Sequence, residues 1–317
     1  MTPQIWAFAV SVTVTLLAGR PFIRRVSHMG GQPIRREGPA THLAKAGTPT
    51  MGGALFVAAT LVVTLAFAGW DPPVVAALAL VTVFAAMGFV DDLAKVRRQA
   101  SLGLRARTKL ALGIFFATAF AFLAMGPLHL GTYLAVPLTR TLVHVPEWVF
   151  LILVNLVVIG STNAVNLTDG LDGLAGGLSL IAVGFYSALA YAEGSFGLGL
   201  LALVLVGAVA GFLAFNLHPA RLIMGDTGAL GLGAALSALA VLTRSELLLP
   251  LVGAVFVVET VSVVLQVVSF RLTGRRIFRM SPLHHHFELG GWTEGKVTRR
   301  FWLAGLVGAM AAYLLWW

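Results

Sequence analysis

Residues 74–92 read VVAALALVTVFAAMGFVDD, an uncharged apolar run that ends in two adjacent aspartates. A helix needs about 17 to 25 consecutive apolar residues to cross a hydrocarbon core about 30 Å thick. The run is long enough for such a helix. It therefore predicts a transmembrane segment that places Asp91 and Asp92 at the edge of a membrane.

The rest of the 317-residue chain has the same character, because 58% of its residues are hydrophobic and only 11% are charged. A water-soluble surface needs roughly a quarter of charged residues, so a soluble domain is excluded. We predict an all-α integral membrane protein that forms a single polytopic domain over residues 1–317. The ten expected transmembrane segments are 4–19, 51–69, 74–90, 109–125, 147–162, 173–192, 197–215, 228–243, 247–269 and 301–316.

Basic residues define the expected orientation. With the N-terminus outside, all 22 Lys and Arg residues except Arg140 and Arg244 fall on the cytoplasmic side, as the positive-inside rule requires. An even number of spans then leaves both termini extracytoplasmic. The net charge of +9 follows from this topology and from attraction to anionic membrane lipid, so it does not indicate a nucleic-acid partner.

The aspartates are also gathered on the cytoplasmic side, where positive-inside topology gives them no purpose. Carboxylates near apolar depth are costly and tend to mark functional sites, so we expect an active-site cleft on the cytoplasmic face. Lys95 follows Asp91 by one helical turn, and an exposed salt bridge is an equally good interpretation of Lys95 alone. Every aspartate except Asp71 belongs to this set: Asp91, Asp92, Asp169, Asp172 and Asp226.

In NAVNLTDGLDG, residues 163–173, four polar side chains recur every third residue: Asn163, Asn166, Asp169 and Asp172. On a helix they share one drifting face. Helix capping would explain Asp169 or Asp172 singly, but not all four in register. We therefore favour a binding surface.

In FNLHPARLIMGDTGAL, residues 215–230, Asp226 directly precedes an apolar helix. A helix cap and a metal ligand are equally good interpretations of Asp226 alone, and Asn216 across the same short loop favours the ligand. Magnesium prefers oxygen ligands, usually one or two carboxylates together with substrate phosphates. The chain has neither cysteine nor an HExxH pair to indicate zinc.

Three adjacent histidines, His284, His285 and His286, lie in SPLHHHFE, residues 281–288, between two basic stretches on the cytoplasmic side. Imidazole and guanidinium groups suit an anionic substrate, while an adventitious metal site is the alternative. GTPTMGG at 47–53 does not match a nucleotide-binding P-loop and, by itself, indicates a turn followed by close helix packing.

Together with KAGTPTMGG at 45–53, GFVDDLAK at 88–95 and GLRARTK at 103–109, these motifs closely resemble the phospho-N-acetylmuramoyl-pentapeptide-transferase family, in order and over nearly the whole chain. The double aspartate and NxxNLTDGLDG alone indicate a wider family, which transfers a sugar phosphate from a UDP-sugar to a polyprenyl phosphate. GTPTMGG and PLHHHFE narrow the resemblance to the muramoyl-pentapeptide branch.

The resemblance implies ten spans in the bacterial cytoplasmic (inner) membrane and Mg²⁺-dependent attack by undecaprenyl phosphate on UDP-MurNAc-pentapeptide, with UMP leaving and lipid I forming. It makes Asp226 the metal ligand and Asp91 and Asp92 candidates for orienting or deprotonating the lipid phosphate. His284 and His285 would complete the catalytic set. The implied substrate contacts are Lys45, Thr50, Lys95, Lys109, Asn163, Asn166, Asp169, Asp172, Asn216 and His286.

Two positions depart from the family pattern. Ile223 stands where the family commonly has an aromatic residue, so a uracil-stacking role there is in question, and His218 sits at a variable position. A sister transferase that uses UDP-N-acetylglucosamine remains an alternative, and a homodimer is left open. A transporter with a coupling-ion site at Glu259 and Gln266 is disfavoured, because no internal repeat is visible and the ionisable residues gather on one face. A hydrogen bond between helices or a neutral buried carboxyl group is the preferred interpretation of Glu259.

Overall fold

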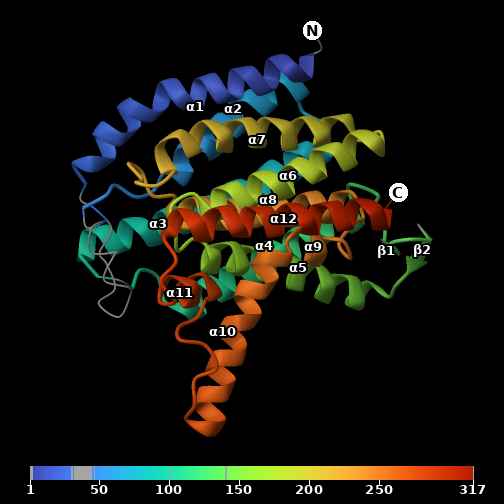
Figure 1. Ribbon diagram of the computed structural model, residues 1–317. Helices are drawn as coiled ribbons and strands as arrows, with labels where there is room; N and C mark the ends of the chain where they lie inside the picture. The colour runs from blue at the N-terminus through green and yellow to red at the C-terminus, as the bar shows by residue number, and fades with distance from the viewer. Residues whose placement is uncertain are drawn as a thin grey trace.

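The computed structural model describes residues 3–29, 31, 45, 47–100, 102–139 and 141–316. The chain folds into a bundle of helices with one small strand pair (Figure 1). The elements are α1 (Pro3–Ser27), α2 (Gly53–Ala68), α3 (Pro72–Arg98), α4 (Ala106–Met125), β1 (Tyr133–Ala135), β2 (Leu142–His144), α5 (Glu147–Thr168), α6 (Leu174–Ala192), α7 (Phe196–Asn216), α8 (Gly225–Leu242), α9 (Leu249–Val252), α10 (Ala254–Thr273), α11 (Leu283–Glu288) and α12 (Glu294–Trp316).

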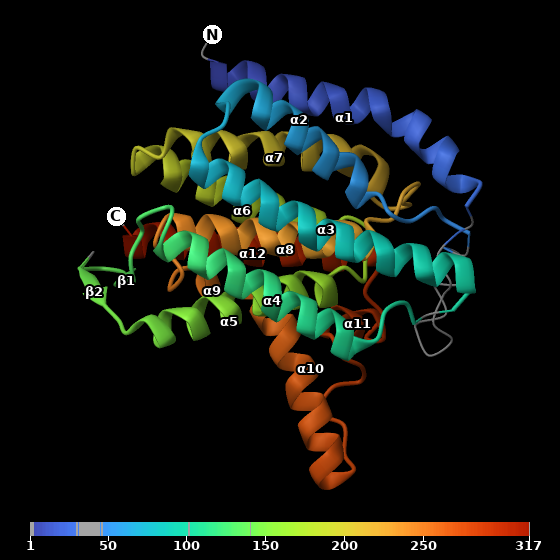
Figure 2. The ribbon, with the colours of Figure 1, turned by 180° about the vertical axis from the view of Figure 1, so that it is seen from behind.

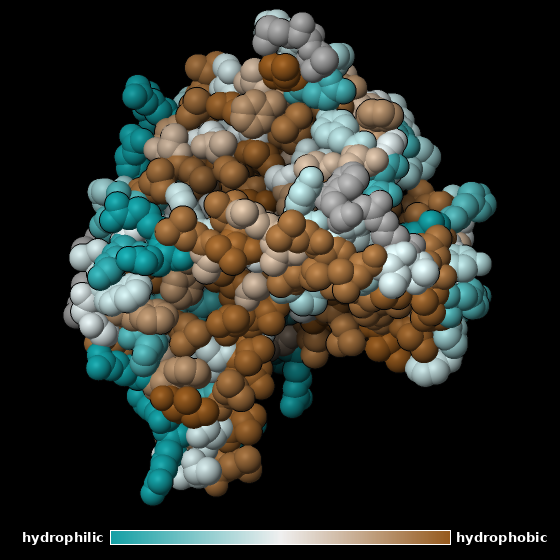
Figure 3. All heavy atoms as spheres, turned by 45° about the vertical axis from the view of Figure 1, so that its right-hand side comes forward, coloured by the Kyte–Doolittle hydropathy of each residue, from teal (hydrophilic) through white to brown (hydrophobic). Residues whose placement is uncertain are grey.

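The helices have the length and composition of a multi-pass membrane protein. In the described part of the chain, eight helices are long and apolar enough to cross a membrane: α1, α3 to α8, and α10. Helix α2 is apolar but shorter, with 16 residues. Hydrophobic residues cover the broad middle of the face seen in Figure 3, and hydrophilic residues gather along its edges. Such an apolar surface suits lipid as the solvent.

Helix α8 forms the centre of the bundle, because all its residues from Gly225 to Leu242 are buried. Glycines bring neighbouring backbones against it. A Cβ atom at Gly88 of α3 would overlap the carbonyl group of Asp226, and one at Gly53 of α2 would overlap the backbone of Gly228. Small residues allow this close approach between membrane helices. The contact at Gly88 brings the end of α3 to the beginning of α8.

Three features were not predicted from the sequence. Strands β1 and β2 pair antiparallel, with Tyr133 opposite His144, in the connection between α4 and α5. A short helix, α11, contains the three histidines. The segment expected at 247–269 is divided into α9 and α10 at Gly253, and α10 projects away from the bundle (Figures 1 and 2).

The two chain ends lie at the end of the bundle that carries β1 and β2, while α3 ends at the opposite end (Figures 1 and 2). Arg244, one of the two basic residues assigned outside, donates a hydrogen bond to the Leu130 carbonyl next to this strand pair, at 2.7 Å. The other, Arg140, lies outside the described residues, as do Arg35 and Arg36, which were expected on the cytoplasmic side.

Glu246 is buried in the connection between α8 and α9, with 3% exposure. Neither of its carboxylate oxygens accepts a hydrogen bond from another described residue. Burial raises the pKa of Glu246 to about 8, so folding opposes its ionisation.

We expect Glu246→Gln to raise the melting temperature of the purified protein at about pH 8 and to change it little at about pH 5. The folded pKa lies above the unfolded value, so ionisation destabilises the fold progressively as pH rises between the two pKa values. Thermal melts in detergent provide the measurement, with the exposed Glu147→Gln as control. Equal melting temperatures for wild type and Glu246→Gln at the higher pH would contradict this account.

Candidate active site

Three aspartates from two helices meet where α3 ends and α8 begins. Asp91 and Asp92 lie in the last turns of α3, and Asp226 lies in the first turn of α8. Their exposed fractions are 0%, 1% and 9%, and one carboxylate oxygen of each lies within 4.8 Å of the others. Buried carboxylates at this separation repel one another unless cations compensate them.

Two lysines supply that compensation. The Nζ atom of Lys95 lies 2.7 Å from Asp91 Oδ2 and 2.8 Å from Asp226 Oδ1. The Nζ atom of Lys109, from the first turn of α4, lies 2.9 Å from Asp226 Oδ2 and 3.2 Å from Asp91 Oδ1. The i,i+4 salt bridge expected between Lys95 and Asp91 is present, but it is not exposed, because the Lys95 side chain is largely buried and also reaches across to Asp226 of α8. We call these five residues the aspartate–lysine cluster.

Asp92 has a different role from its neighbour. Its carboxylate accepts hydrogen bonds from the backbone N–H groups of Asp226 at 3.1 Å and Thr227 at 2.9 Å, and from the Thr227 hydroxyl at 2.7 Å. A carboxylate that accepts these N–H groups stabilises a helix N-terminus. Asp92 of α3 therefore caps α8, whereas Asp226 makes no capping bond with its own helix. The interpretation of Asp226 as a helix cap is therefore wrong, and Asp92 of α3 caps α8 instead.

Thr50 lies next to the point where the end of α3 meets the beginning of α8. Its hydroxyl is buried and has no hydrogen-bond partner among the described residues. A Cβ atom at Gly225 would lie 2.7 Å from Thr50 Oγ1, and Gly225 has a φ of +72°, which favours glycine. Thr50 and the α8 N-terminus are therefore in close contact.

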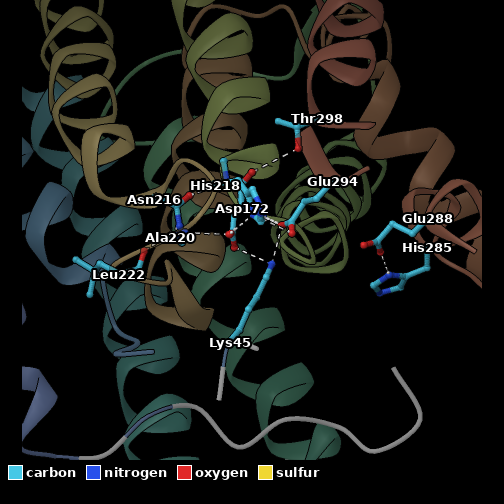
Figure 4. Close-up of polar contacts among 11 residues, drawn as sticks. Lys45, Asp172, Asn216, His218, Ala220, Leu222, His285, Glu288, Glu294 and Thr298 are labelled. Atoms are coloured by element: carbon cyan, nitrogen blue, oxygen red, sulfur yellow. Dashed lines mark hydrogen bonds and ion pairs between the residues drawn. The ribbon is translucent and has the colours of Figure 1, made fainter. Parts of the chain in front are cut away.

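A second charged group lies at the beginning of α12 (Figure 4). The Lys45 Nζ atom is 2.7 Å from Asp172 Oδ1 and 2.6 Å from Glu294 Oε1. The His218 Nδ1 atom is 3.1 Å from Asp172 Oδ2 and 3.2 Å from Glu294 Oε2. Burial opposes the charged form of Lys45, but the two carboxylates outweigh burial and leave its pKa raised. We call these four residues the Lys45 cluster.

Sequence reasoning missed two members of the Lys45 cluster. Glu294 belongs to no recognisable motif and precedes the span expected at 301–316, whereas the structure begins α12 at this residue. His218 was noted only as a variable position. Both residues reach Asp172 from distant parts of the chain, and this proximity is not visible in the sequence.

Both polar atoms of the Asn216 side-chain amide form hydrogen bonds. Its Oδ1 accepts from the Gly173 backbone at 3.1 Å, and its Nδ2 donates to the Leu222 carbonyl at 2.9 Å. Asp172 is held by the Ala220 backbone N–H at 3.0 Å. These bonds connect the 169–173 turn, which carries Asp172 of the Lys45 cluster, to the loop between α7 and α8.

The four polar residues of 163–172 do not all lie on one helix. Asn163 and Asn166 belong to the last turns of α5, which ends at Thr168, while Asp169 and Asp172 lie in the following turn. Burial and then the charges of Asp226 and Asp92 raise the pKa of Asp169 to about 8. Charges of both clusters therefore act on Asp169. Asp226 and Asp92 raise its pKa, whereas Lys45 of the other cluster lowers it.

The three histidines make three different sets of contacts. His284 is fully buried, and Glu259 Oε1 accepts its backbone N–H at 3.1 Å and lies 3.2 Å from its Nδ1 atom. His285 Nδ1 pairs with Glu288 Oε2 at 2.8 Å, and His286 Nδ1 accepts from the Arg279 backbone. A Cβ atom at Gly170 would overlap His284 Nε2, so His284 packs against the 169–173 turn.

The side chains considered for a transporter site are engaged in structural bonds. The hydrogen bond of Glu259 is with the α11 loop rather than with another long helix. Gln266 Oε1 accepts from the backbone of Ile277 at 3.0 Å and Phe278 at 2.9 Å. Both residues therefore anchor the histidine loop to α10.

Two groups of possible metal ligands exist among the described residues, Asp91–Asp92–Asp226 and Asp172–His218–Glu294. The first offers only carboxylate oxygens, which is the ligand chemistry that Mg²⁺ prefers. Because Asp92 is committed to capping α8, Asp226 and Asp91 are the carboxylates best suited to a cation. In the second group, the Lys45 ammonium already contacts both carboxylates.

An all-helical membrane protein with carboxylates and lysines converging at its helix ends suits transfer of a phosphorylated group, and residues 74–244 match the model of the glycosyl transferase family 4. Residues 45–57 match signature 1 of phospho-N-acetylmuramoyl-pentapeptide-transferase. The chain belongs to the phospho-N-acetylmuramoyl-pentapeptide-transferase family.

Proteins of that name are similar to this chain over almost its full length. The one from Moorella thermoacetica is 49% identical, with 99% of both chains covered. The one from Symbiobacterium thermophilum is 49% identical over 93% of this chain and 89% of the relative. The one from Shouchella clausii is 45% identical over 99% and 96%, respectively.

Proposed function

We propose that the aspartate–lysine cluster is the reaction centre of a phospho-N-acetylmuramoyl-pentapeptide transferase, which transfers phospho-MurNAc-pentapeptide from UDP-MurNAc-pentapeptide to undecaprenyl phosphate. UMP is released and lipid I is formed in peptidoglycan biosynthesis. The convergence of Asp91, Asp92 and Asp226 with two lysines carries this proposal. The family membership supports it.

Phosphoryl transfer depends mainly on positioning and on neutralising charge around the transferred group. Asp226 would hold Mg²⁺, with Asp91 beside it, and the bound ion would neutralise charge on the donor diphosphate. Lys95 and Lys109 now satisfy Asp226, and their ammonium groups would turn to substrate phosphates. Asp91, which faces both lysines, is better suited than Asp92 to orient or deprotonate the lipid phosphate, because Asp92 is occupied by α8.

The donor would be held between the aspartate–lysine cluster and the Lys45 cluster. Thr50, Asn163, Asn166, Asp169, Asp172 and Asn216 are proposed to contact or position the nucleotide and sugar, as is His286. His284 and His285 would complete the site, with buried His284 acting through the 169–173 turn. Ile223 offers no aromatic ring, so uracil stacking is not expected there.

Eight candidate spans together with α2 and α12 would make ten membrane passes, with both termini extracytoplasmic and the site open to the cytoplasm. Residues 1–317 would form one domain in the bacterial cytoplasmic membrane. This placement allows a soluble nucleotide donor and a membrane lipid to reach the same carboxylates. Positive residues at the inner ends of the helices support the orientation.

The purified protein in detergent is expected to release UMP when UDP-MurNAc-pentapeptide, undecaprenyl phosphate and Mg²⁺ are all supplied. Omission of the lipid, or chelation of the cation, should reduce UMP to background. Replacing the donor by UDP-N-acetylglucosamine tests the sister activity, and we expect at least about a hundredfold lower kcat/KM with it. Comparable rates with the two donors would refute the assignment to the muramoyl branch.

A further inference from the structure

One face of α12 holds the short segment between the end of α5 and the beginning of α6. Glu294, Thr298 and Trp302 follow one another at intervals of four residues, so their side chains share this face. Glu294 Oε1 accepts the backbone N–H of Asp172, and the Thr298 hydroxyl donates to the Asp172 carbonyl at 3.4 Å. The Trp302 indole N–H donates to the Leu174 carbonyl at 3.3 Å. These three side chains fix the backbone next to the Lys45 cluster.

Glu294 differs from Thr298 and Trp302 because its contacts extend to side chains (Figure 4). Its Oε1 atom lies 2.6 Å from Lys45 Nζ, and its Oε2 atom lies 3.2 Å from His218 Nδ1. The bonds of Thr298 and Trp302 described above are with backbone carbonyl groups. Glu294 therefore connects the anchored backbone to the Lys45 ammonium group.

The Lys45 ammonium group is held by two carboxylates rather than one. Asp172 Oδ1 lies 2.7 Å from its Nζ atom, and Glu294 Oε1 approaches the same atom. Lysine has a flexible four-carbon stem and loses much rotamer freedom when its ammonium group is fixed, and a single ion pair offsets only part of that loss. Glu294, as the second carboxylate, therefore keeps the ammonium group at one position. The Lys45 side chain retains 18% exposure, so a bound molecule can still reach it.

Asp172 is oriented by contacts of its own. Its Oδ2 atom accepts the backbone N–H of Ala220 at 3.0 Å and lies 3.1 Å from His218 Nδ1. The backbone N–H of Asp172 is held by Glu294. Glu294 thus fixes the position of Asp172 relative to Lys45.

We propose that Glu294 is a positioning residue for the nucleotide-sugar donor, because it holds Lys45 and Asp172 in the arrangement that binds the donor. None of the described contacts of Glu294 involves the aspartate–lysine cluster, so its removal should affect donor binding more than the chemical step. The negative charge of Glu294 matters as well as its shape, since the group that it holds is a cation. The assignment deepens the proposed transferase function and rests on it.

Glu294→Gln tests this role. Gln has nearly the same shape, and its oxygen still accepts the N–H of Asp172, but it lacks the charge that holds Lys45. We expect the KM for UDP-MurNAc-pentapeptide to rise at least about tenfold, while kcat and the KM for undecaprenyl phosphate change less than about threefold. UMP release is measured with each substrate varied in turn. Glu147→Gln, which removes an exposed carboxylate of α5, should leave all three constants at their wild-type values.

Thr298→Val separates the positioning of Lys45 from the anchoring of the backbone. It removes a hydrogen bond to the same Asp172 backbone but leaves the ion pair between Lys45 and Glu294 in place. We expect the donor KM to change less than about threefold. A rise as large as that of Glu294→Gln would show that Glu294 only anchors the backbone, and would overturn the proposal.

A second test combines Glu294→Gln with Lys45→Met and measures the Kd of the donor by calorimetry without the lipid acceptor. In the Lys45→Met background, Glu294→Gln should change this Kd less than about twofold, because the ammonium group that Glu294 positions is absent. An equal factor in both backgrounds, or an unchanged donor KM in Glu294→Gln alone, would overturn the proposal. Failure of the wild type to release UMP would instead refute the transferase function itself.

Discussion

Asp226→Asn is expected to reduce UMP release by at least about a thousandfold, the scale on which removal of a key charge-stabilising group lowers kcat. Asn has nearly the same shape as Asp but lacks the negative charge that would hold a divalent cation beside Asp91. Lys95 and Lys109 would keep Asp91 as a partner, so the fold should persist. Turnover is measured at saturating substrates over a Mg²⁺ titration.

The exposed carboxylate of Glu147 provides the matched control, because Glu147→Gln removes the same charge far from the cluster. This control should retain wild-type turnover and the wild-type Mg²⁺ dependence. Near-normal rates in Asp226→Asn at any Mg²⁺ concentration would remove Asp226 from the site. An unchanged melting temperature would show that the loss is chemical rather than structural.

Asp91→Asn and Asp92→Asn should both lower turnover at least about a hundredfold, but only the second should also destabilise the protein. Asp92 accepts three hydrogen bonds from Asp226 and Thr227, and an amide in its place would direct an N–H group at one of these donors. Loss of a helix cap costs about 0.5 to 2 kcal/mol. A lower melting temperature is therefore expected for Asp92→Asn.

Asp91 makes one backbone hydrogen bond, from Leu104 at 2.7 Å, which the oxygen of Asn can still accept. Asp91→Asn should accordingly melt close to the wild-type temperature while losing activity. Thermal melts and UMP release on the same preparations separate the two effects. If both variants melted alike, the division into a capping aspartate and a substrate-facing aspartate would be wrong.

The acidic part of the site was predictable because its residues occur at the ends of apolar runs. Asp91 and Asp92 end one such run and Asp226 begins another, so their approach to a common membrane edge followed from hydropathy alone. The lysine partners were harder to assign. Lys95 had a local explanation as a helix salt bridge, and only the packing of α3 on α8 brings it to Asp226.

Other contacts could not be predicted from the neighbouring residues in the sequence. Glu294 contacts Lys45 across most of the chain, and His218 contacts Glu294 and Asp172 from a loop. The three consecutive histidines suggested one cluster, but helix α11 directs them to Glu259, Glu288 and the Arg279 backbone. Neighbours along a helix point in different directions, so sequence adjacency did not predict a shared site.

The amino-acid sequence by itself determined that this is a helical membrane protein of the transferase family, because a long apolar run in lipid must satisfy its backbone within a helix. It also predicted that the acidic motifs gather at one edge of the membrane. Only the tertiary structure decided the separate roles of Asp91, Asp92 and Asp226. Those roles depend on backbone contact between α3 and α8 at Gly88, and the distance between two helices is set by packing across the fold rather than by the pattern along either one.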